Sequence, residues 1–307
     1  IFKNMITNKI ITKLILRSSF YYFYLSKGKI DNIKLTPPDP WSGDPNLGEA
    51  IFQGKYSFSG QKYYAPNNPV WYPRGMLDEW LADMHSFSWL RHLKAKSGSL
   101  ARKHARGIIN NWLIKNNSWQ DYSWRADILA RRISAWLSNA GFLFAEQDEE
   151  FSYEFRKSLS RQVKHLQIIT KKSLFNKIEK QIGETEGSVF KVQIIRGLLL
   201  SSICLDNGIK NFNKSLEFLL DEISKQIRTD GVHITRNPST HLYILADFIT
   251  IRDTLIAANE GVPEELKHII LKMAHALRLF RLGDGGLARF NGSRAEKKII
   301  IDKVLTA

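Results

Sequence analysis

A helical repeat of apolar residues runs through most of this 307-residue chain. From about residue 76 to about residue 282, apolar side chains recur three or four positions apart, the spacing that places them on one face of a helix. Pro263-Glu264 has the composition of a helix start, and Asn207-Gly208 that of a helix stop. The pattern predicts about eight helices, at roughly 77–95, 98–115, 124–141, 148–172, 188–205, 209–228, 239–258 and 263–281.

The connections between these predicted helices are mostly short, so sequence neighbours are expected to pack antiparallel. A string of helical hairpins is typical of a bundle, a solenoid or a closed α/α toroid. No exact repeat period is visible, which disfavours a regular solenoid. The sequence therefore predicts a mainly α domain over residues 76–282.

Residues 1–35 are predicted to form a basic N-terminal helix, because they carry seven Lys or Arg residues and one Asp. Lys13 and Arg17 interrupt its apolar residues, so no uncharged run reaches the ~20 residues of an integral membrane span. Two interpretations stay open: the segment lies on a membrane surface, or it packs its apolar side on the domain. No clean signal peptide is present, which suggests a cytoplasmic location.

Two other segments differ from the helical part. Residues 36–75 are rich in Pro, Gly and Trp, which disfavours a helix, and the stretch from Ile51 to Phe58 suggests a small β-hairpin or an extended arm. Residues 283–307 combine a Gly-rich linker with the β-branched run Ile299-Ile300-Ile301. That run predicts the first strand of a further β domain, truncated in this chain.

The formal charge of +15 directs attention to polyanionic partners: nucleic acid, anionic lipid or acidic polysaccharide. Apolar residues make up 43% of the chain, which argues against wholesale disorder. Cys204 is the only cysteine, so an internal disulfide or a Cys-rich metal site is excluded. No nucleotide-binding or nucleic-acid-binding motif is recognised, and the sequence indicates no metal and no cofactor.

The connection between the predicted helices 209–228 and 239–258 concentrates groups that can carry chemistry. It holds His233, Arg236 and Asn237, and His241 follows on the next helix. Connections held by a rigid scaffold are common places for sites. Tyr243 lies two residues beyond His241, and a straight helix would point it the other way.

A second group of candidates lies nearer the N-terminus. Arg131 and Arg132 lie inside an apolar stripe, where they would hold a carboxylate or sulfate, or form a structural ion pair with a neighbouring helix. His85 and Trp89 lie in an aromatic stretch that would line a saccharide cleft or fill the core.

Several stretches together resemble the heparinase II/III-like family of polysaccharide lyases over roughly residues 40–305. The resemblance rests on Trp41-Ser42-Gly43-Asp44-Pro45, Met84-His85-Ser86-Phe87-Ser88-Trp89-Leu90-Arg91, Ala130-Arg131-Arg132-Ile133-Ser134-Ala135-Trp136, Asp230-Gly231-Val232-His233-Ile234-Thr235-Arg236-Asn237-Pro238-Ser239 and Gly283-Asp284-Gly285-Gly286-Leu287-Ala288-Arg289-Phe290-Asn291-Gly292. It implies an incomplete α/α toroid followed by a β-sandwich domain, of which this chain is expected to hold only the first strand. It also implies a periplasmic location.

The resemblance implies β-elimination on a polysaccharide that contains uronic acid. A uronate carboxylate must be neutralised, a base must remove the proton at C5, and an acid must protonate the leaving oxygen. By analogy Asn237 or Arg236 would neutralise the carboxylate, and His241 or His233 would carry the proton.

Substrate-binding roles are carried over in the same way. The residues predicted to contact the substrate are two aromatic residues, two arginines and one histidine: Trp89, Tyr243, Arg131, Arg132 and His85.

The sequence departs from the lyase pattern at two places. Thr240 stands where the family has a catalytic Tyr, and the stretch 183–188 lacks the family's Asn. The chain without its β-sandwich is therefore expected to be inactive. The alternative is a non-catalytic polysaccharide-binding or cell-envelope assembly protein that retains the toroid fold. The sequence carries no signal of oligomeric state.

Overall fold

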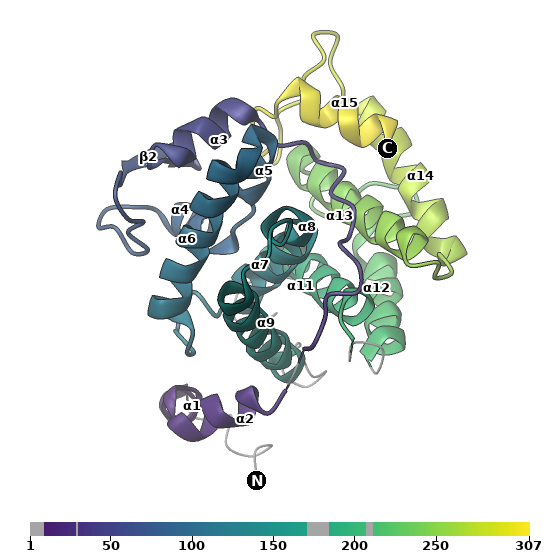
Figure 1. Ribbon diagram of the computed structural model, residues 1–307. Coiled ribbons are helices and arrows are strands. Elements are labelled where there is room, and N and C mark those ends of the chain that lie inside the picture. Colours follow the sequence, from purple (N-terminus) through teal and green to yellow (C-terminus); the bar gives the residue numbers. More distant parts are fainter. Residues whose placement is uncertain (1–8, 29, 171–183, 207–210) are drawn as a thin grey trace. The chain divides into compact units, whose positions relative to one another are not determined.

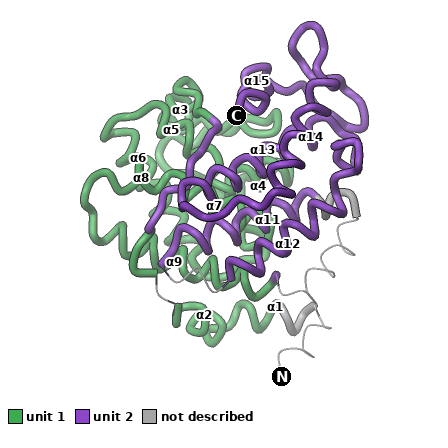
Figure 2. Tube along the Cα trace, turned by 90° about the vertical axis from the view of Figure 1, so that its right-hand side faces the viewer, with its two compact units in different colours: residues 1–33, 42–169 green, residues 34–41, 170–307 purple. Residues whose placement is uncertain are grey.

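The computed structural model describes residues 9–28, 30–170, 184–206 and 211–307, with the side chains of residues 9–12 and 184–188 left aside. The described chain is mainly helical and divides into two compact units (Figures 1 and 2). Unit 1 comprises residues 1–33 and 42–169, and unit 2 comprises residues 34–41 and 170–307.

Unit 1 contains most of the short elements. Its described helices and strands are α1 (Lys9–Arg17), α2 (Ser19–Ser26), α3 (Pro45–Phe52), β1 (Lys55–Phe58), β2 (Gln61–Tyr64), α4 (Asp78–Ser86), α5 (Leu90–Lys96), α6 (Gly98–Asn116), α7 (Ala126–Ser138), α8 (Ala140–Leu143) and α9 (Glu149–Ile169). The predicted helix 77–95 is therefore two helices. Phe87 separates them, because its left-handed backbone (φ 57°) ends α4.

The core of unit 1 is built around buried aromatic rings. Trp112 and Trp136 meet edge to face with ring centres 5.7 Å apart, and Phe87 and Phe155 pack against Trp136 at 5.6 and 4.7 Å. Edge-to-face pairs place the positive edge of one ring on the negative face of the other. This cluster joins α6, α7 and α9 to the turn between α4 and α5.

Unit 2 consists of α11 (Glu184–Cys204), α12 (Phe212–Gln226), α13 (Pro238–Ala257), α14 (Glu264–Leu279) and α15 (Lys298–Thr306) among the described residues. Helix α13 is apolar on nearly all sides, as expected for a helix buried by its neighbours. Leu242, Leu245 and Phe248 are fully buried in its core. Helices α11, α14 and α15 pack against it (Figure 1).

The strand predicted at Ile299-Ile300-Ile301 is wrong, because this run lies in helix α15. Ile301 and Val304 are buried, three residues apart on one helical face, where they pack into the core of unit 2. Burial of that face overrides the β-propensity of the three isoleucines. The segment expected to begin another domain therefore belongs to this one.

The Pro- and Gly-rich segment contains the predicted hairpin, together with a helix that was not predicted. Strands β1 and β2 pair antiparallel from Lys55 opposite Tyr64 to Phe58 opposite Gln61. Before them, Pro45 begins α3, and the Asp44 carboxylate accepts the Asn46 backbone N–H at 2.9 Å. Asp followed by Pro is a favourable helix start, so the density of turn residues was misleading there.

The basic N-terminal segment forms two helices. Helix α2 packs on α9 and buries Tyr21 and Leu25, while Phe20 and Phe23 remain exposed. The Tyr21 hydroxyl lies 2.6 Å from His165 Nδ1. The interpretation that this segment packs on the domain is thus confirmed for one face of α2. Among the described residues, no helix is both long and apolar enough to cross a bilayer.

Two helical glycines give a matched test of the packing. A Cβ on Gly48 in α3 would lie 2.2 Å from the His92 carbonyl oxygen of α5, whereas a Cβ on Gly107 in α6 would meet no atom within 4 Å. We expect Gly48→Ala to lower the free energy of unfolding by about 1–3 kcal/mol through overpacking. Gly107→Ala should raise it by about 0.5–1 kcal/mol through helix propensity. Urea unfolding followed by circular dichroism measures both, and equal effects would contradict the close contact of α3 with α5.

Candidate functional site

The connection between α12 and α13 folds back against α14. Ile227 and His233 form an isolated antiparallel bridge, and the Asp230 carboxylate accepts the Val232 N–H at 2.9 Å. Gly231 has φ +80°, and a Cβ on it would lie 2.7 Å from the Lys272 carbonyl oxygen of α14. Only glycine satisfies both the backbone conformation and the close approach.

His233 is fully buried, and both of its ring nitrogens have partners. Nδ1 accepts the Thr235 N–H at 3.3 Å, so Nε2 carries the proton and donates to Gln226 Oε1 at 3.1 Å. Burial lowers the pKa of His233 to about 4. The imidazole is therefore neutral at pH 7, with its lone pair already occupied.

His241 is also fully buried and ties three segments together. Its Nδ1 accepts the His233 backbone N–H at 3.3 Å, and its Nε2 donates to the Met273 carbonyl oxygen at 2.8 Å. Burial lowers its pKa as well. The imidazole thus joins α13 to the connection before it and to α14. The two candidate bases are both structural in this conformation.

Asn237 caps α13 and also binds a second loop. Its Oδ1 accepts the Thr240 N–H at 3.0 Å, and its Nδ2 donates to the Asn291 carbonyl oxygen at 2.8 Å. The Asn291 side chain in turn donates to the Arg236 carbonyl oxygen at 3.1 Å. The amide predicted to neutralise a uronate is therefore committed to the fold.

Among the four catalytic candidates, Arg236 is the one whose side chain points to solvent. Its side chain is 57% exposed, and its nearest acidic group is Asp230, 3.9 Å away. The backbone at Arg236 is left-handed, with φ 49°. Such a conformation is uncommon for a residue with a side chain, and it sets the direction of the Cα–Cβ bond from which the side chain extends.

A segment that the sequence analysis did not single out as a site lies against the start of α13. Ser293 Oγ accepts the Ser239 N–H at 3.2 Å, and Ser239 Oγ accepts the Arg294 N–H at 2.9 Å. Tyr243 is 45% exposed, and its hydroxyl donates to Glu296 at 2.6 Å. Exposed Arg289 and Arg294 belong to the same segment. The Gly-rich stretch that overlaps this segment contributed to the family resemblance. That resemblance was the one feature of the sequence that could have pointed to the segment.

Three of the candidates in unit 1 lie in its core. His85 and Arg132 are fully buried, and Trp89 is 3% exposed with its indole N–H on the Met84 carbonyl oxygen at 3.1 Å. Arg132 donates to the carbonyl oxygens of His85 and Ser123 at 3.1 and 2.8 Å. In this conformation none of the three presents a surface to a polysaccharide, so the substrate contacts predicted for them are not available.

Arg131 forms the ion pair that was one of its two predicted roles. Its Nη1 lies 3.0 Å from Asp83 Oδ1, and Ser59 binds the other oxygen of that carboxylate at 3.1 Å. Arg131 is partly buried, so this pair joins α7 to α4 and to the hairpin turn. A structural role accounts for its place in an apolar stripe.

Two features named from the sequence lie outside what the structure describes. The first is Asn207-Gly208, the predicted helix stop. The second is the stretch 183–188, whose side chains are not described. Within the described parts of the chain, no group of three or more His, Cys, Asp or Glu side chains is placed to hold a metal ion.

The buried state of His233 predicts a pH dependence of stability. Its folded pKa of about 4 lies below the unfolded value near 6.5, so its contribution to stability is complete above pH 6.5 and is lost as the pH falls towards 4. We expect His233→Gln, which keeps a donor for Gln226, to shrink the difference in unfolding free energy between pH 7.5 and pH 5 by about 2 kcal/mol. Urea unfolding at both pH values measures it, with His268→Gln on the exposed side of α14 as the control. An unchanged difference would show that His233 titrates as an exposed histidine does.

Comparisons with known proteins were made by sequence and by structure. No protein-family model matches the chain. FtsZ-localized protein C of Caulobacter vibrioides is 26% identical over 263 residues, which are 85% of this chain and 43% of that protein. The chain therefore spans less than half the length of this curated relative.

Solved structures give a likeness of fold. Heparinase III matches with a TM-score of 0.66 and 16% identity, over 92% of this chain and 46% of that one. Heparan sulfate lyase HepC from Pedobacter heparinus matches with a TM-score of 0.57 and 15% identity, over 91% of this chain and 45% of that one. The predicted fold class, a mainly helical α/α toroid, is confirmed at this level. Over about nine-tenths of its length, this chain has the fold of the corresponding part of heparinase III and heparan sulfate lyase.

Proposed function

We propose that this chain binds an acidic polysaccharide of the heparan sulfate class, and that its own described residues do not supply the base for β-elimination. The binding surface is the α13 N-terminal surface, formed by Arg236, Asn237, Thr240, Tyr243 and segment 289–296. The observation that carries the proposal is the exposed guanidinium of Arg236, which extends from a left-handed backbone on a fold shared with heparan sulfate lyase.

The chemistry of this surface suits carboxylate and sulfate groups. Guanidinium groups bind such oxyanions through two parallel N–H donors, and segment 289–296 contributes two further exposed arginines, Arg289 and Arg294. The first turn of α13 adds a weak positive potential. Because these cations are exposed, each contact is modest and is weakened by salt.

The hydrogen bonds of the two histidines argue against proton abstraction by them. A general base needs a free lone pair within reach of the proton that it removes. The lone pairs of His233 and His241 accept backbone N–H groups, and both rings are fully buried. Thr240, at the position where the family resemblance expects Tyr, has a hydroxyl that is a poor base. Binding without catalysis fits these residues best.

Lyase activity remains a second candidate, and the fold likeness to heparinase III favours it. This chain covers 46% of that protein, so the base of a lyase would be Tyr243 or a residue beyond the matched part. The curated relative is named for its localisation with FtsZ and not for a reaction, which fits a non-catalytic role.

A pair of substitutions tests the binding surface. Arg236→Gly removes the cation and relieves the left-handed backbone, so it should weaken binding to heparan sulfate about threefold or more while slightly raising the melting temperature. Asp230→Asn removes the neighbouring negative charge and keeps its hydrogen-bond acceptor, so it should strengthen binding. Calorimetric titration at low and physiological salt measures both. Equal affinities for the two variants would contradict a role for Arg236.

Absorbance tests the chemistry separately. β-Elimination leaves an unsaturated uronate that absorbs ultraviolet light where the substrate does not. We expect this chain to give no such signal with heparan sulfate, heparin or other uronic-acid polysaccharides, under conditions where binding is measurable. A rise in absorbance that Tyr243→Phe abolishes would instead identify Tyr243 as the base and establish a lyase.

A further inference from the structure

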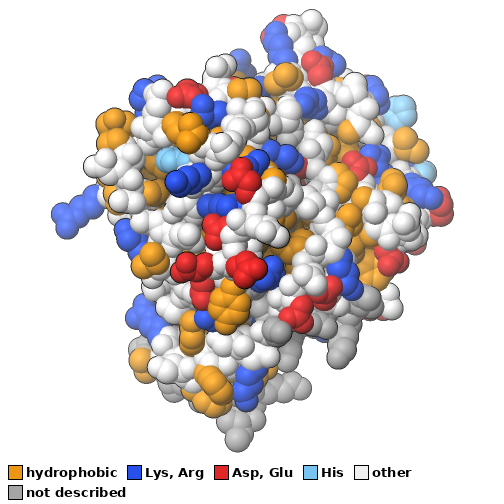
Figure 3. All heavy atoms as spheres, viewed as in Figure 1, with side chains coloured by type: hydrophobic (Ala, Val, Ile, Leu, Met, Phe, Trp, Pro, Cys, Tyr) orange, Lys and Arg blue, Asp and Glu red, His pale blue; other side chains and the backbone are white. Residues whose placement is uncertain are grey.

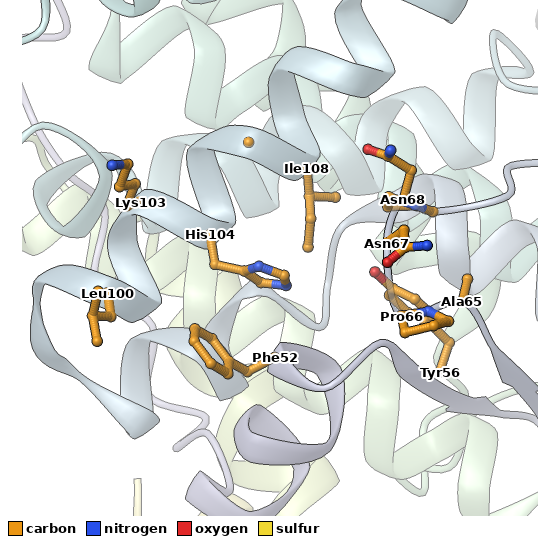
Figure 4. A pocket seen from close by; sticks show the side chains of 12 residues that line it. Phe52, Tyr56, Ala65, Pro66, Asn67, Asn68, Leu100, Lys103, His104 and Ile108 are labelled. Atoms are coloured by element: carbon orange, nitrogen blue, oxygen red, sulfur yellow. The ribbon is translucent and has the colours of Figure 1, made fainter.

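Unit 1 contains a solvent-open pocket of about 360 Å³, and its lining includes no residue of the α13 N-terminal surface. Its walls come from the end of α3, from the segment 65–69 that follows β2, and from one face of α6 (Figure 4). The α6 residues on this wall are Leu100, Lys103, His104, Gly107 and Ile108, spaced as one helical face. The volume lies within the usual range of small-ligand sites.

The pocket is held open by rigid backbone contacts. Gly54 has φ +78°, and a Cβ on it would lie 2.3 Å from the Ala65 carbonyl oxygen, so segment 65–69 is kept close to the end of α3. The Ala65 N–H donates to the Gly54 carbonyl oxygen at 2.8 Å. On the other side, Asn111 of α6 bonds the Trp71 indole at 2.8 Å and Asn68 at 3.4 Å.

One residue that lines the pocket has an unused hydrogen-bonding atom. His104 Nε2 is buried and has no protein partner, while the ring lies 4.9 Å from the Phe52 ring. Burial lowers the pKa of His104, although an interaction with the backbone of Ile51 acts in the other direction. A neutral imidazole leaves Nε2 as an acceptor that needs a donor such as a hydroxyl group. Figure 4 shows the ring projecting between Phe52 and Asn67.

The remaining lining groups favour a polar ring that carries a negative charge. Asn67 and Asn68 present amides from the exposed segment, and Lys103 stands at the edge of the pocket. Among the lining residues, Lys103 is the one with a full charge, and none is acidic. Phe52 and Ile108 add apolar surface, which the C–H faces of a sugar ring match.

We propose that this pocket is a second saccharide subsite that accepts one uronic acid residue, with the ring against Phe52 and His104, its hydroxyls on His104 Nε2 and the two asparagine amides, and its carboxylate on Lys103. The inference rests on the proposed function for the class of ligand alone. The residues of the subsite are otherwise independent of the α13 N-terminal surface.

Gly107 offers a way to fill the pocket without disturbing the fold. A Cβ there meets no atom within 4 Å, and a helical side chain leans towards the preceding turn, which here carries Lys103 and His104. We expect Gly107→Phe to weaken the binding of methyl β-D-glucuronide about tenfold or more, measured by ligand-observed NMR. Gly261→Phe also adds an aromatic residue in open space, in unit 2, and should leave binding unchanged.

The charge of the ligand tests Lys103 separately. Methyl β-D-glucuronide should bind about threefold more tightly than methyl β-D-glucoside, and Lys103→Met should remove that preference. Asn67→Ala, at an exposed position outside any helix, should weaken both ligands and repeats the test if Gly107→Phe fails to fold. No binding of the glucuronide to the unaltered chain, or equal binding by folded Gly107→Phe, would overturn the subsite.

The two proposals fail in different ways. If heparan sulfate binding depends on Arg236 but the glucuronide is insensitive to Gly107→Phe and Asn67→Ala, the proposed function stands and the subsite is wrong. If the glucuronide binds with the expected sensitivity while the polymer does not bind, the subsite stands and the proposed function is wrong.

Discussion

The buried imidazole of His241 determines how the start of α13 is arranged. It accepts the His233 N–H on one side and donates to the Met273 carbonyl oxygen on the other, so one ring links helix α13, the connection before it and α14. A buried polar group left without a partner costs about 1–3 kcal/mol, and here both nitrogens are satisfied. With the ring fixed, the Asn237 cap and the Arg236 backbone are fixed as well. The same hydrogen bonds that order this surface occupy the lone pairs that catalysis by these histidines would need.

The stretches that resemble lyases serve mainly as scaffolding in unit 1. His85 and Arg132 come from two different stretches, yet Arg132 donates to the His85 carbonyl oxygen and lies 4.2 Å from the centre of the Trp112 ring. The His85 ring accepts the Trp112 indole N–H and, through its other nitrogen, contacts the Trp71 carbonyl oxygen. Burial lowers the pKa of His85 to about 3 and that of Arg132 to about 9. Such residues specify a fold, which is why the resemblance predicted the architecture better than it predicted substrate contacts.

The long helices were predictable because each buries one apolar stripe against a neighbour, and the stripe is visible as a 3.6-residue period. The errors in predicted secondary structure arose where the local sequence pattern favours one conformation and tertiary contacts stabilise another. Ile299-Ile300-Ile301 has strand propensity, but only the core of unit 2 shows that Ile301 and Val304 must share a helical face. The break at Phe87 was not visible, because a left-handed backbone at a residue other than glycine has no compositional signal.

The candidate site stays a prediction, and the roles of its residues were not readable from the sequence. Whether His241 is a base or a structural link depends on a carbonyl oxygen 32 residues away, and one partner each of Asn237 and Ser239 lies more than 50 residues away. Sequence spacing describes neighbours on one element. It does not describe which backbone N–H group donates to the lone pair of a histidine nitrogen.

The net charge of the chain determines its general attraction to polyanions. The positions of the individual charged side chains determine which polyanion is preferred. A formal charge of +15 draws the protein towards any polyanion, but on the face shown in Figure 3 basic and acidic side chains are interspersed. A net charge of this kind raises encounter rates and is screened by salt, so it does not discriminate among nucleic acid, lipid and polysaccharide. Discrimination requires groups held at fixed spacing. At Arg236 the backbone from which the side chain extends is constrained by a left-handed turn and by the Asn291 side chain on its carbonyl oxygen. The proposal of a polysaccharide ligand therefore depends on the rigidity of this one connection more than on the total number of cations.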